Sequence, residues 1–190
     1  MANRAMLLGV DNKEFDYNST DILAAGSYCI PLFWFTLYSP EDIVLKEIVM
    51  VDGTFEQCPT LIVDWSIAKS RVLERRKHIF AIIPKAYSEI YDTWIRFIDS
   101  IEATYLHIDM TEIWMMADDF NTFYENLKKA LNVFIISDQE KISILLNEYV
   151  GITIKDKLFT KKNIHPETEE DIISLLCGYS WSGEVPWEKD

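Results

Sequence analysis

Glycine, cysteine and histidine are scarce in this sequence, and their scarcity excludes several classes of site. The six glycines lie too far apart in the chain to form a GxGxxG fingerprint or a phosphate-binding loop. The three histidines belong to no HExxH motif or Cys/His cluster, so neither a metal ion nor a cofactor is predicted. Three widely spaced cysteines argue against a disulfide framework and a CxxC motif, and they predict reduced, buried thiols at Cys29, Cys58 and Cys177.

Long hydrophobic runs are also missing. The most apolar stretch, residues 30–38, is far shorter than the roughly 20 residues that cross a bilayer. Near the N-terminus, Asp11 interrupts an apolar run before that run reaches the length of a signal-peptide core. The sequence therefore predicts a cytoplasmic protein without a membrane partner.

What the sequence has in excess is negative charge. Its formal net charge is −13, from 31 acidic and 18 basic residues. Residues 1–60 hold nine acids and three bases, and residues 165–190 hold seven acids and one base. Such a surface repels phosphate backbones and attracts basic macromolecules, so we expect a basic protein partner and no nucleic acid. The alternative is that the acidity serves solubility alone.

The hydrophobic pattern predicts one acidic globular domain over residues 1–190, of the α+β class. A chain of 190 residues, 49% of them hydrophobic, can bury a core without a metal or a disulfide. We expect a helix-rich fold of about six helices with a small, mostly antiparallel sheet, because strands and helices do not alternate strictly along the chain.

Local patterns place the expected elements. Strands are expected at residues 4–10, 60–65 and 104–110, and a hairpin over residues 48–57, where Asp52-Gly53 suits a type I′ turn. A short helix is expected from the capping residue Ser39 to about Lys46, while residues 28–38 fit either a buried helix or a strand. Longer helices are expected at about residues 66–83, 85–103, 119–134, 137–150 and 166–177, the first two separated at Pro84.

Clusters of bases and tryptophans carry further expectations. Five bases within nine residues are expected on a solvated helix that pairs with acids elsewhere: Lys69, Arg71, Arg75, Arg76 and Lys77. Four tryptophans in apolar contexts are expected in the core: Trp34, Trp65, Trp94 and Trp114. Trp181 and Trp187 follow the last expected helix and must dock, either onto the protein's own core or onto a partner. The predicted partner-binding residues lie in the two acidic ends: Asp16, Tyr17, Asp21, Trp181, Glu184 and Trp187.

One local arrangement is compatible with catalysis. Alternation along residues 104–110 places His107 and Asp109 on one strand face, about 7 Å apart, and Glu112 follows. Such a group could ligate a metal or act as an acid and base. Equally, this face could be the wet side of a half-buried sheet, on which His107 has no role.

Two segments carry a resemblance to a known family. The start, Met1-Ala2-Asn3-Arg4 followed by apolar residues, and the later segment Tyr28-x-Ile30-Pro31-Leu32, with Leu37 and Ser39, resemble an uncharacterised bacterial family over about forty residues. Its members begin Met-Ala-Asn-Arg-Ser-Tyr-Leu and carry Tyr-Asp-Ile-Pro-Leu soon after. Here Ala5 and Met6 replace Ser-Tyr, and Cys29 replaces the aspartate. The resemblance implies a bacterial cytoplasmic protein and brings no activity with it.

These observations lead to three hypotheses of function. The first is a protein-binding module, an immunity-type inhibitor that neutralises a basic bacterial toxin by occlusion, because an acidic surface steers and selects a basic partner. The second is an enzyme without a short signature that uses His107, Asp109 and Glu112. The third is a scaffold or regulatory protein that self-associates through its aromatic residues.

Overall fold

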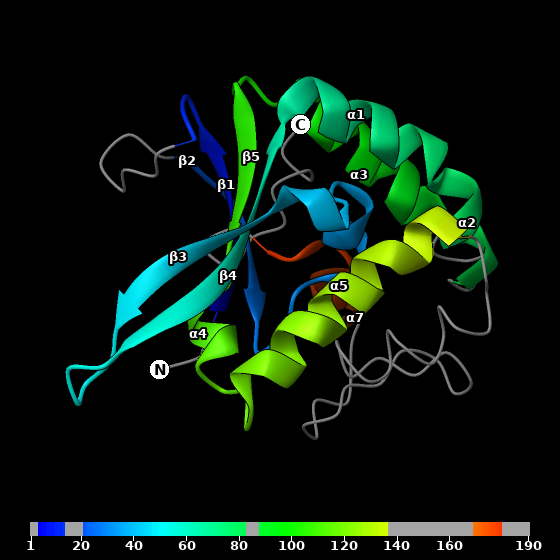
Figure 1. The fold of residues 1–190 in the computed structure, drawn as a ribbon. Coiled ribbons are helices and arrows are strands. Elements are labelled where there is room, and N and C mark those ends of the chain that lie inside the picture. Colours follow the sequence, from blue (N-terminus) through cyan, green and yellow to red (C-terminus); the bar gives the residue numbers. More distant parts are fainter. Residues whose placement is uncertain (1–3, 14–20, 83–87, 137–168, 180–190) are drawn as a thin grey trace.

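The computed structural model describes residues 4–13, 21–82, 88–136 and 169–179. They contain a single antiparallel sheet of five strands in the order β2-β1-β5-β4-β3 (Figure 1). The strands are β1 (Arg4–Val10), β2 (Asp21–Ser27), β3 (Ile43–Val49), β4 (Phe55–Asp64) and β5 (Tyr105–Asp109). The α-helices are α1 (Trp65–Glu74), α2 (Arg76–Ile82), α3 (Ser88–Ser100), α4 (Thr111–Trp114), α5 (Phe120–Ile136) and α7 (Glu169–Cys177). The predicted α+β class is confirmed.

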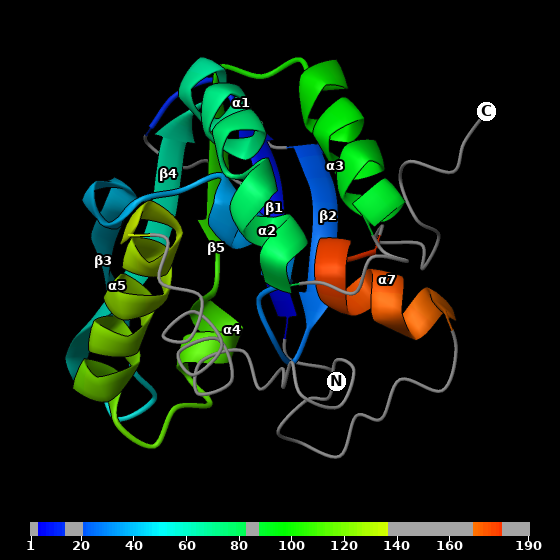
Figure 2. The same ribbon diagram turned by 90° about the vertical axis from the view of Figure 1, so that its right-hand side faces the viewer.

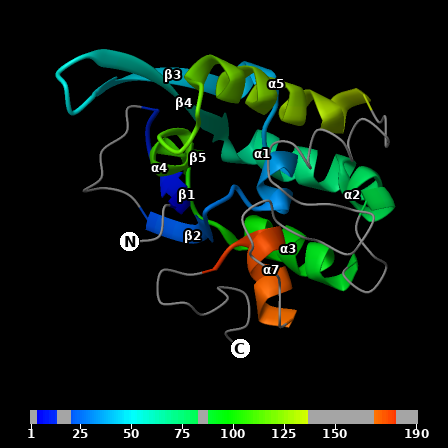
Figure 3. The ribbon, with the colours of Figure 1, turned by 90° about the horizontal axis from the view of Figure 1, so that it is seen from below.

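Most of the helices form one layer against one face of the sheet (Figure 2). Alternate residues of the strands, such as Leu7, Leu61 and Ile108, share a buried apolar cluster with residues of α1 and α3. Viewed from below, α5 runs beside β3, whereas α7 lies near β2 (Figure 3). The two outer helices therefore stand at opposite edges of the sheet.

Between β4 and β5 the chain makes a helical excursion that leaves and re-enters the sheet at one end. The Asp64 carboxylate accepts a hydrogen bond from the Ser66 amide, 2.8 Å away, and caps α1. At the return, the Trp65 amide donates to the Thr104 carbonyl at 3.0 Å. The Tyr91 hydroxyl of α3 donates to the Val72 carbonyl of α1 at 2.8 Å, which ties the two helices together. Because the excursion returns to the end of β4 at which it began, β5 lies next to β4, between β4 and β1.

A short 3₁₀ helix, η2 (Leu32–Thr36), is wholly buried between the helices. It resolves the ambiguity of residues 28–38, whose continuous apolar run fits a segment buried on all sides. Three of the four expected core tryptophans (Trp34, Trp94 and Trp114) are fully buried, and Trp65 is partly buried. The cysteines are reduced and buried, as predicted, and burial raises the pKa of Cys29 to about 12 and that of Cys58 to about 11.

Several local predictions are wrong. The capping box at Ser39 starts only a three-residue 3₁₀ turn, η3 (Pro40–Asp42), after which β3 begins, so no helix runs to Lys46. The expected strands at residues 54–57 and 60–65 are one strand, β4. Neither β2 nor α4 was expected. The helix predicted at residues 66–83 breaks at Arg75, while Pro84 and residues 137–150 lie outside the described residues.

The turn predicted at Asp52-Gly53 is present and joins β3 to β4, but its type differs from the prediction. A type I′ turn needs positive φ at both central residues, and of the two only Gly53 has it, at 83°. The Gly53 amide donates to the Met50 carbonyl at 2.9 Å, and the Met50 amide donates to the Thr54 carbonyl at 2.8 Å. This is the three-residue turn in which a left-handed glycine closes the hairpin with a bulge.

Candidate partner-binding surface

The β3–β4 hairpin reaches out beyond the helices and the other strands (Figure 1). It also carries exposed apolar side chains. Five of the eleven large hydrophobic residues that are exposed in the described ranges lie on it: Val44, Leu45, Val49, Val51 and Phe55. At the far end Val51 is fully exposed, and Phe55 is 63% exposed. Apolar side chains that gather in this way mark an interaction surface more often than scattered ones do.

The outer edge of β3 pairs with no other strand among the described residues. Strand pairing sets Val44 opposite Thr60, Lys46 opposite Cys58 and Ile48 opposite Glu56. Because Met50 and Thr54 are bonded at the turn, and bonded pairs alternate, these pairs carry the bonds between the strands. The position between them agrees, since Leu45 faces Pro59, which has no amide hydrogen to donate.

It follows that the intervening residues of β3 aim their backbone groups outward. Leu45, Glu47 and Val49 make no hydrogen bond outside the β3–β4 ladder within the part of the chain that the structure describes. All three are exposed. A strand edge with unpaired N–H and C=O groups and apolar side chains is a template for another strand.

A cleft of about 690 Å³ separates the hairpin from the start of α5. Its walls combine aromatic and acidic side chains: Leu45, Phe55, Glu56, Gln57, Asp118, Asp119, Phe120, Asn121 and Tyr124. The Asp119 carboxylate caps α5, accepting from the Thr122 hydroxyl at 2.6 Å and the Asn121 amide at 3.0 Å. These two bonds, the hydroxyl first, hold its pKa below the usual value. The cleft is therefore lined by carboxyl groups next to apolar surface, and the shift favours the ionised form of Asp119.

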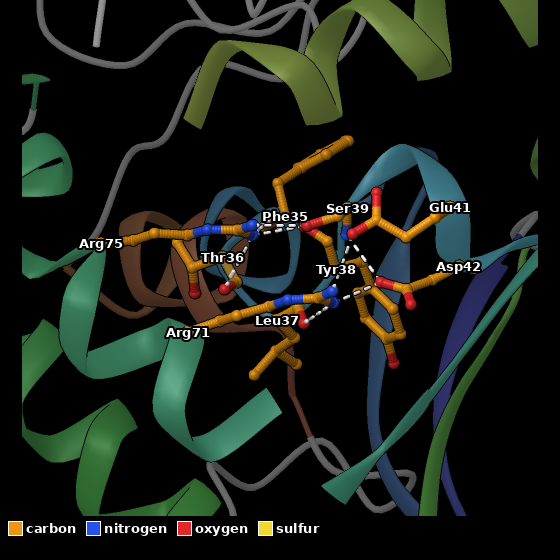
Figure 4. Close-up of polar contacts among 9 residues, drawn as sticks. All are labelled: Phe35, Thr36, Leu37, Tyr38, Ser39, Glu41, Asp42, Arg71 and Arg75. Carbon is orange, nitrogen blue, oxygen red and sulfur yellow. Dashed lines mark hydrogen bonds and ion pairs between the residues drawn. The ribbon is translucent and has the colours of Figure 1, made fainter. Parts of the chain in front are cut away.

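Arg71 of α1 and Arg75, at the C-terminal end of α1, anchor the base of the hairpin (Figure 4). Arg75 is 6% exposed, and its guanidinium donates to the carbonyls of Phe35 (3.2 Å), Thr36 (3.1 Å) and Tyr38, and to the Ser39 hydroxyl (2.7 Å). The Phe35 and Thr36 carbonyls lie at the C-terminal end of η2, where a helix leaves its carbonyls without partners within the helix. Burial, and then the charge of Arg71, lower the pKa of Arg75 to about 10.

Arg71 binds the next residues along the chain. It donates to the Leu37 carbonyl at 3.4 Å and pairs with Glu41 at 3.1 Å and with Asp42. Asp42 in turn accepts the Ser39 amide at 2.7 Å. The two arginines thus fix the segment that leads directly into β3.

The expectation of solvated, ion-paired bases therefore holds for Lys69 and Arg76. Arg71 is ion-paired but only 15% exposed, and the expectation is wrong for Arg75. Lys69 pairs with Asp99, and Arg76 pairs with Asp92 at 2.7 Å, both at the surface. Arg75 is buried and bonded to carbonyls instead of a carboxylate. The break between α1 and α2 falls at Arg75, which the run of bases in the sequence does not signal.

The residues of the catalytic hypothesis are separately engaged. His107 and Asp109 are each 3% exposed, so their strand face is not a wet one. The His107 Nε2 contacts the Thr60 hydroxyl, which donates to the Ile108 carbonyl at 2.6 Å. Burial lowers the pKa of His107 to about 4, which keeps the imidazole neutral near pH 7.

The two carboxylates of that hypothesis also have structural partners. Asp109 accepts the Thr111 amide at 2.9 Å and the Thr111 hydroxyl at 2.6 Å at the start of α4, and it pairs with Lys46 at 3.3 Å. Glu112 accepts the Arg4 amide at 2.7 Å. Within the described ranges, no three His, Cys, Asp or Glu side chains are grouped so that they could hold a metal ion.

Of the six predicted partner-binding residues, only Asp21 lies in the described ranges. It is exposed at the start of β2, at the opposite edge of the sheet from β3. Asp16, Tyr17, Trp181, Glu184 and Trp187 lie outside the described residues. The hairpin surface was therefore missed, although its signal is present: residues 43–51 are apolar apart from two charges and have no helical period.

The chain was compared with models of known protein families, with curated proteins and with solved structures. None of the three comparisons found a match. Among the described helices, none is long and apolar enough to cross a membrane.

Proposed function

We propose that this protein is a protein-binding module of the cytoplasm, an immunity-type inhibitor that occludes a basic bacterial toxin. The single observation that carries the proposal is the β3 edge, where outward backbone groups and exposed apolar side chains coincide. Such an edge lacks only a partner strand to satisfy it.

The charge of the chain supports a basic partner. The net charge is −13, and the surroundings of the edge follow it, with Glu47 and Asp52 exposed on the hairpin and Asp118 and Asp119 exposed beside the cleft. Complementary potential raises the association rate of a basic partner and disfavours acidic ones. The same field opposes nucleic acids.

The enzyme hypothesis has weaker support. A general acid or base works best when its pKa lies near the operating pH, whereas the pKa of His107 is about 4. Asp109 caps α4, and Glu112 holds the start of β1. Each of the three side chains already serves the fold.

Self-association is the second candidate, because an open edge strand can also pair with a second copy of itself. Two copies would each bring a net charge of −13, so their approach is opposed by repulsion that a basic partner does not meet. We therefore favour the basic partner.

Growth rescue tests the proposal. The full chain is co-expressed in a bacterial host with each basic toxin encoded beside it, and we expect one of these toxins to be neutralised. The variant Leu45→Ser should lose the rescue, while Leu73→Ser, which alters an exposed leucine on α1, should keep it. Failure of the intact chain to rescue or to bind any of these toxins would overturn the proposal.

A further inference from the structure

We infer that the partner binds by strand addition, contributing an extended segment that pairs with the open edge of β3. This inference rests on the proposed function and specifies how the partner is recognised. The edge offers the outward backbone groups of Leu45, Glu47 and Val49, which no other described segment uses. Continuing the sheet would satisfy these groups without rearranging the hairpin.

The side chains of β3 define what the added strand must carry. Leu45, Glu47 and Val49 alternate along the strand and therefore share one face. The residues paired with Glu47 and Val49, Gln57 and Phe55, line the cleft together with Leu45, so this is the face that looks toward α5. The three positions are apolar, acidic and apolar in order.

A complementary segment therefore has the pattern apolar-x-basic-x-apolar. Residues directly opposite each other in neighbouring strands interact, and opposite charges stabilise such a pair while like charges destabilise it. A lysine or arginine opposite Glu47 would also lie beside the carboxylates and aromatic rings of the cleft, which suit a cationic side chain. The pattern commits the edge to a basic strand.

The opposite edge of the sheet does not offer the same opportunity. Tyr179 pairs with Ala25 of β2, through bonds of 2.6 and 2.8 Å between their backbones, so that edge is already occupied at this point. Strand addition is thus expected at β3.

The test uses the full chain and a synthetic peptide of sequence Thr-Val-Thr-Lys-Thr-Val-Thr, which reads the same in both directions. Its control has Glu in place of the central Lys. Binding is followed by NMR at peptide concentrations up to the millimolar range, through the amide signals of β3. We expect the Lys peptide to shift Leu45, Glu47 and Val49 and to bind about fivefold more tightly than the Glu peptide.

Three variants of one residue separate the backbone from the side chain. Glu47→Pro removes an outward N–H but no bond to β4, and should weaken Lys-peptide binding about tenfold relative to Glu47→Ala. Glu47→Lys should reverse the preference, so that the Glu peptide binds better. In all three variants, unchanged amide signals of β5 show that the fold is kept.

The outcomes are distinguishable. If Glu47→Pro binds as well as Glu47→Ala, or if the peptide shifts map elsewhere or are absent, strand addition is wrong; the proposed function stands as long as toxin rescue still depends on Leu45. Equal binding of both peptides removes the basic strand as the occupant. Concentration-dependent shifts of the β3 amides without any peptide would identify a second copy as the occupant and overturn the inference.

Discussion

The two edges of this sheet are treated differently by the same chain. At the β2 edge, α7 ends at Cys177, whose carbonyl accepts the Trp34 indole at 2.8 Å, and Tyr179 then pairs with Ala25. At the β3 edge, the strand is exposed, and its outward backbone groups have no partner among the described residues. Within the described ranges, a distant segment pairs with one edge and no segment pairs with the other.

The difference shows that long-range contacts act differently at the two edges of the sheet. Exposed edges are a hazard that proteins usually cover or shorten. Here the cover is used at β2, while the base of β3 is held rigidly by two buried or half-buried arginines, Arg71 and Arg75. An edge that is anchored firmly and left open is typical of a docking surface rather than of a frayed strand.

The largest expected effect comes from breaking the anchor of the open edge. Arg75→Met should lower the free energy of unfolding by roughly 3–5 kcal/mol, because several buried acceptors each cost about 1–3 kcal/mol when left unpaired. Urea denaturation followed by circular dichroism measures it. The matched control is Arg76→Met, one residue along, whose exposed ion pair with Asp92 contributes little.

Should Arg75→Met fail to fold, Arg75→Lys gives the same answer in milder form. A lysine keeps the charge but lacks the planar fork that reaches several carbonyls at once, so stability should fall part of the way. Equal stability of the Arg75 and Arg76 variants would mean that the base of β3 is not anchored by Arg75.

A change in the middle of the sheet should act on both edges alike. The folded state holds the pKa of His107 at about 4, whereas an unfolded histidine titrates near 6.5. Below pH 6.5 the unfolded chain binds a proton that the folded chain refuses. The free energy of unfolding is therefore highest above pH 6.5 as far as this residue is concerned. It decreases as the pH falls toward 4, by about 3 kcal/mol in total.

The pH dependence is isolated by comparison with His107→Gln. Other groups that titrate in this range are common to both proteins, so the difference in slope between pH 6.5 and 4 reports His107 together with its charge interaction with Asp109. An NMR titration of the His107 ring gives its pKa directly. A value near 6.5 would refute the prediction whatever the stability data show.

Two glycines offer a matched test of packing at the two edges. Gly178, at φ 86°, seals the β2 edge, and Gly53, at φ 83°, closes the turn at the end of β3. A Cβ at Gly178 would lie 2.7 Å from the Ala25 carbonyl oxygen, whereas nothing lies within 4 Å of one at Gly53. Gly178→Ala should cost roughly 2–3 kcal/mol and Gly53→Ala about 1 kcal/mol.

Both variants place an alanine at a positive φ and so share the same backbone strain. The difference between their losses of stability therefore measures how closely Gly178 packs against β2. Thermal denaturation of the two proteins is sufficient. If the two alanine variants lose equal stability, the segment after α7 does not press against β2.

Short-range signals in the sequence predicted much of this architecture. The strand at Arg4–Val10, the helix from residue 120 and the helix end at Gly178 follow from a short apolar run, an apolar stripe and a glycine stop. The strand β2 was missed because its seven residues, Asp21–Ser27, contain small side chains without clear alternation. Its identity as a strand depends on pairing with β1 and with Tyr179, which are distant contacts.

The site was harder to predict than the fold, for a physical reason. Strand order determines which edge is open, and the order β2-β1-β5-β4-β3 arises from insertion of β5 after a long helical excursion. A capping box at Ser39 is a real local signal, yet the following residues, Ile43–Val49, pair with β4 instead of continuing a helix. Tertiary pairing outweighed the local helix start.

The last prediction concerns amide hydrogen exchange in the unaltered protein, which compares the two edges directly and needs no change in stability. The Ala25 and Glu47 amides both point outward from edge strands, but only the Ala25 amide has an acceptor, the Tyr179 carbonyl at 2.6 Å. In hydrogen–deuterium exchange at neutral pH, the Glu47 amide should exchange many times faster than that of Ala25, while its neighbours Lys46 and Ile48, bonded toward β4, stay protected. Slow exchange at Glu47 would mean that the β3 edge is already covered and has no room for a partner strand. In Gly178→Ala the Ala25 amide should exchange nearly as fast as Glu47, because the bond that sets the two edges apart depends on the turn at Gly178.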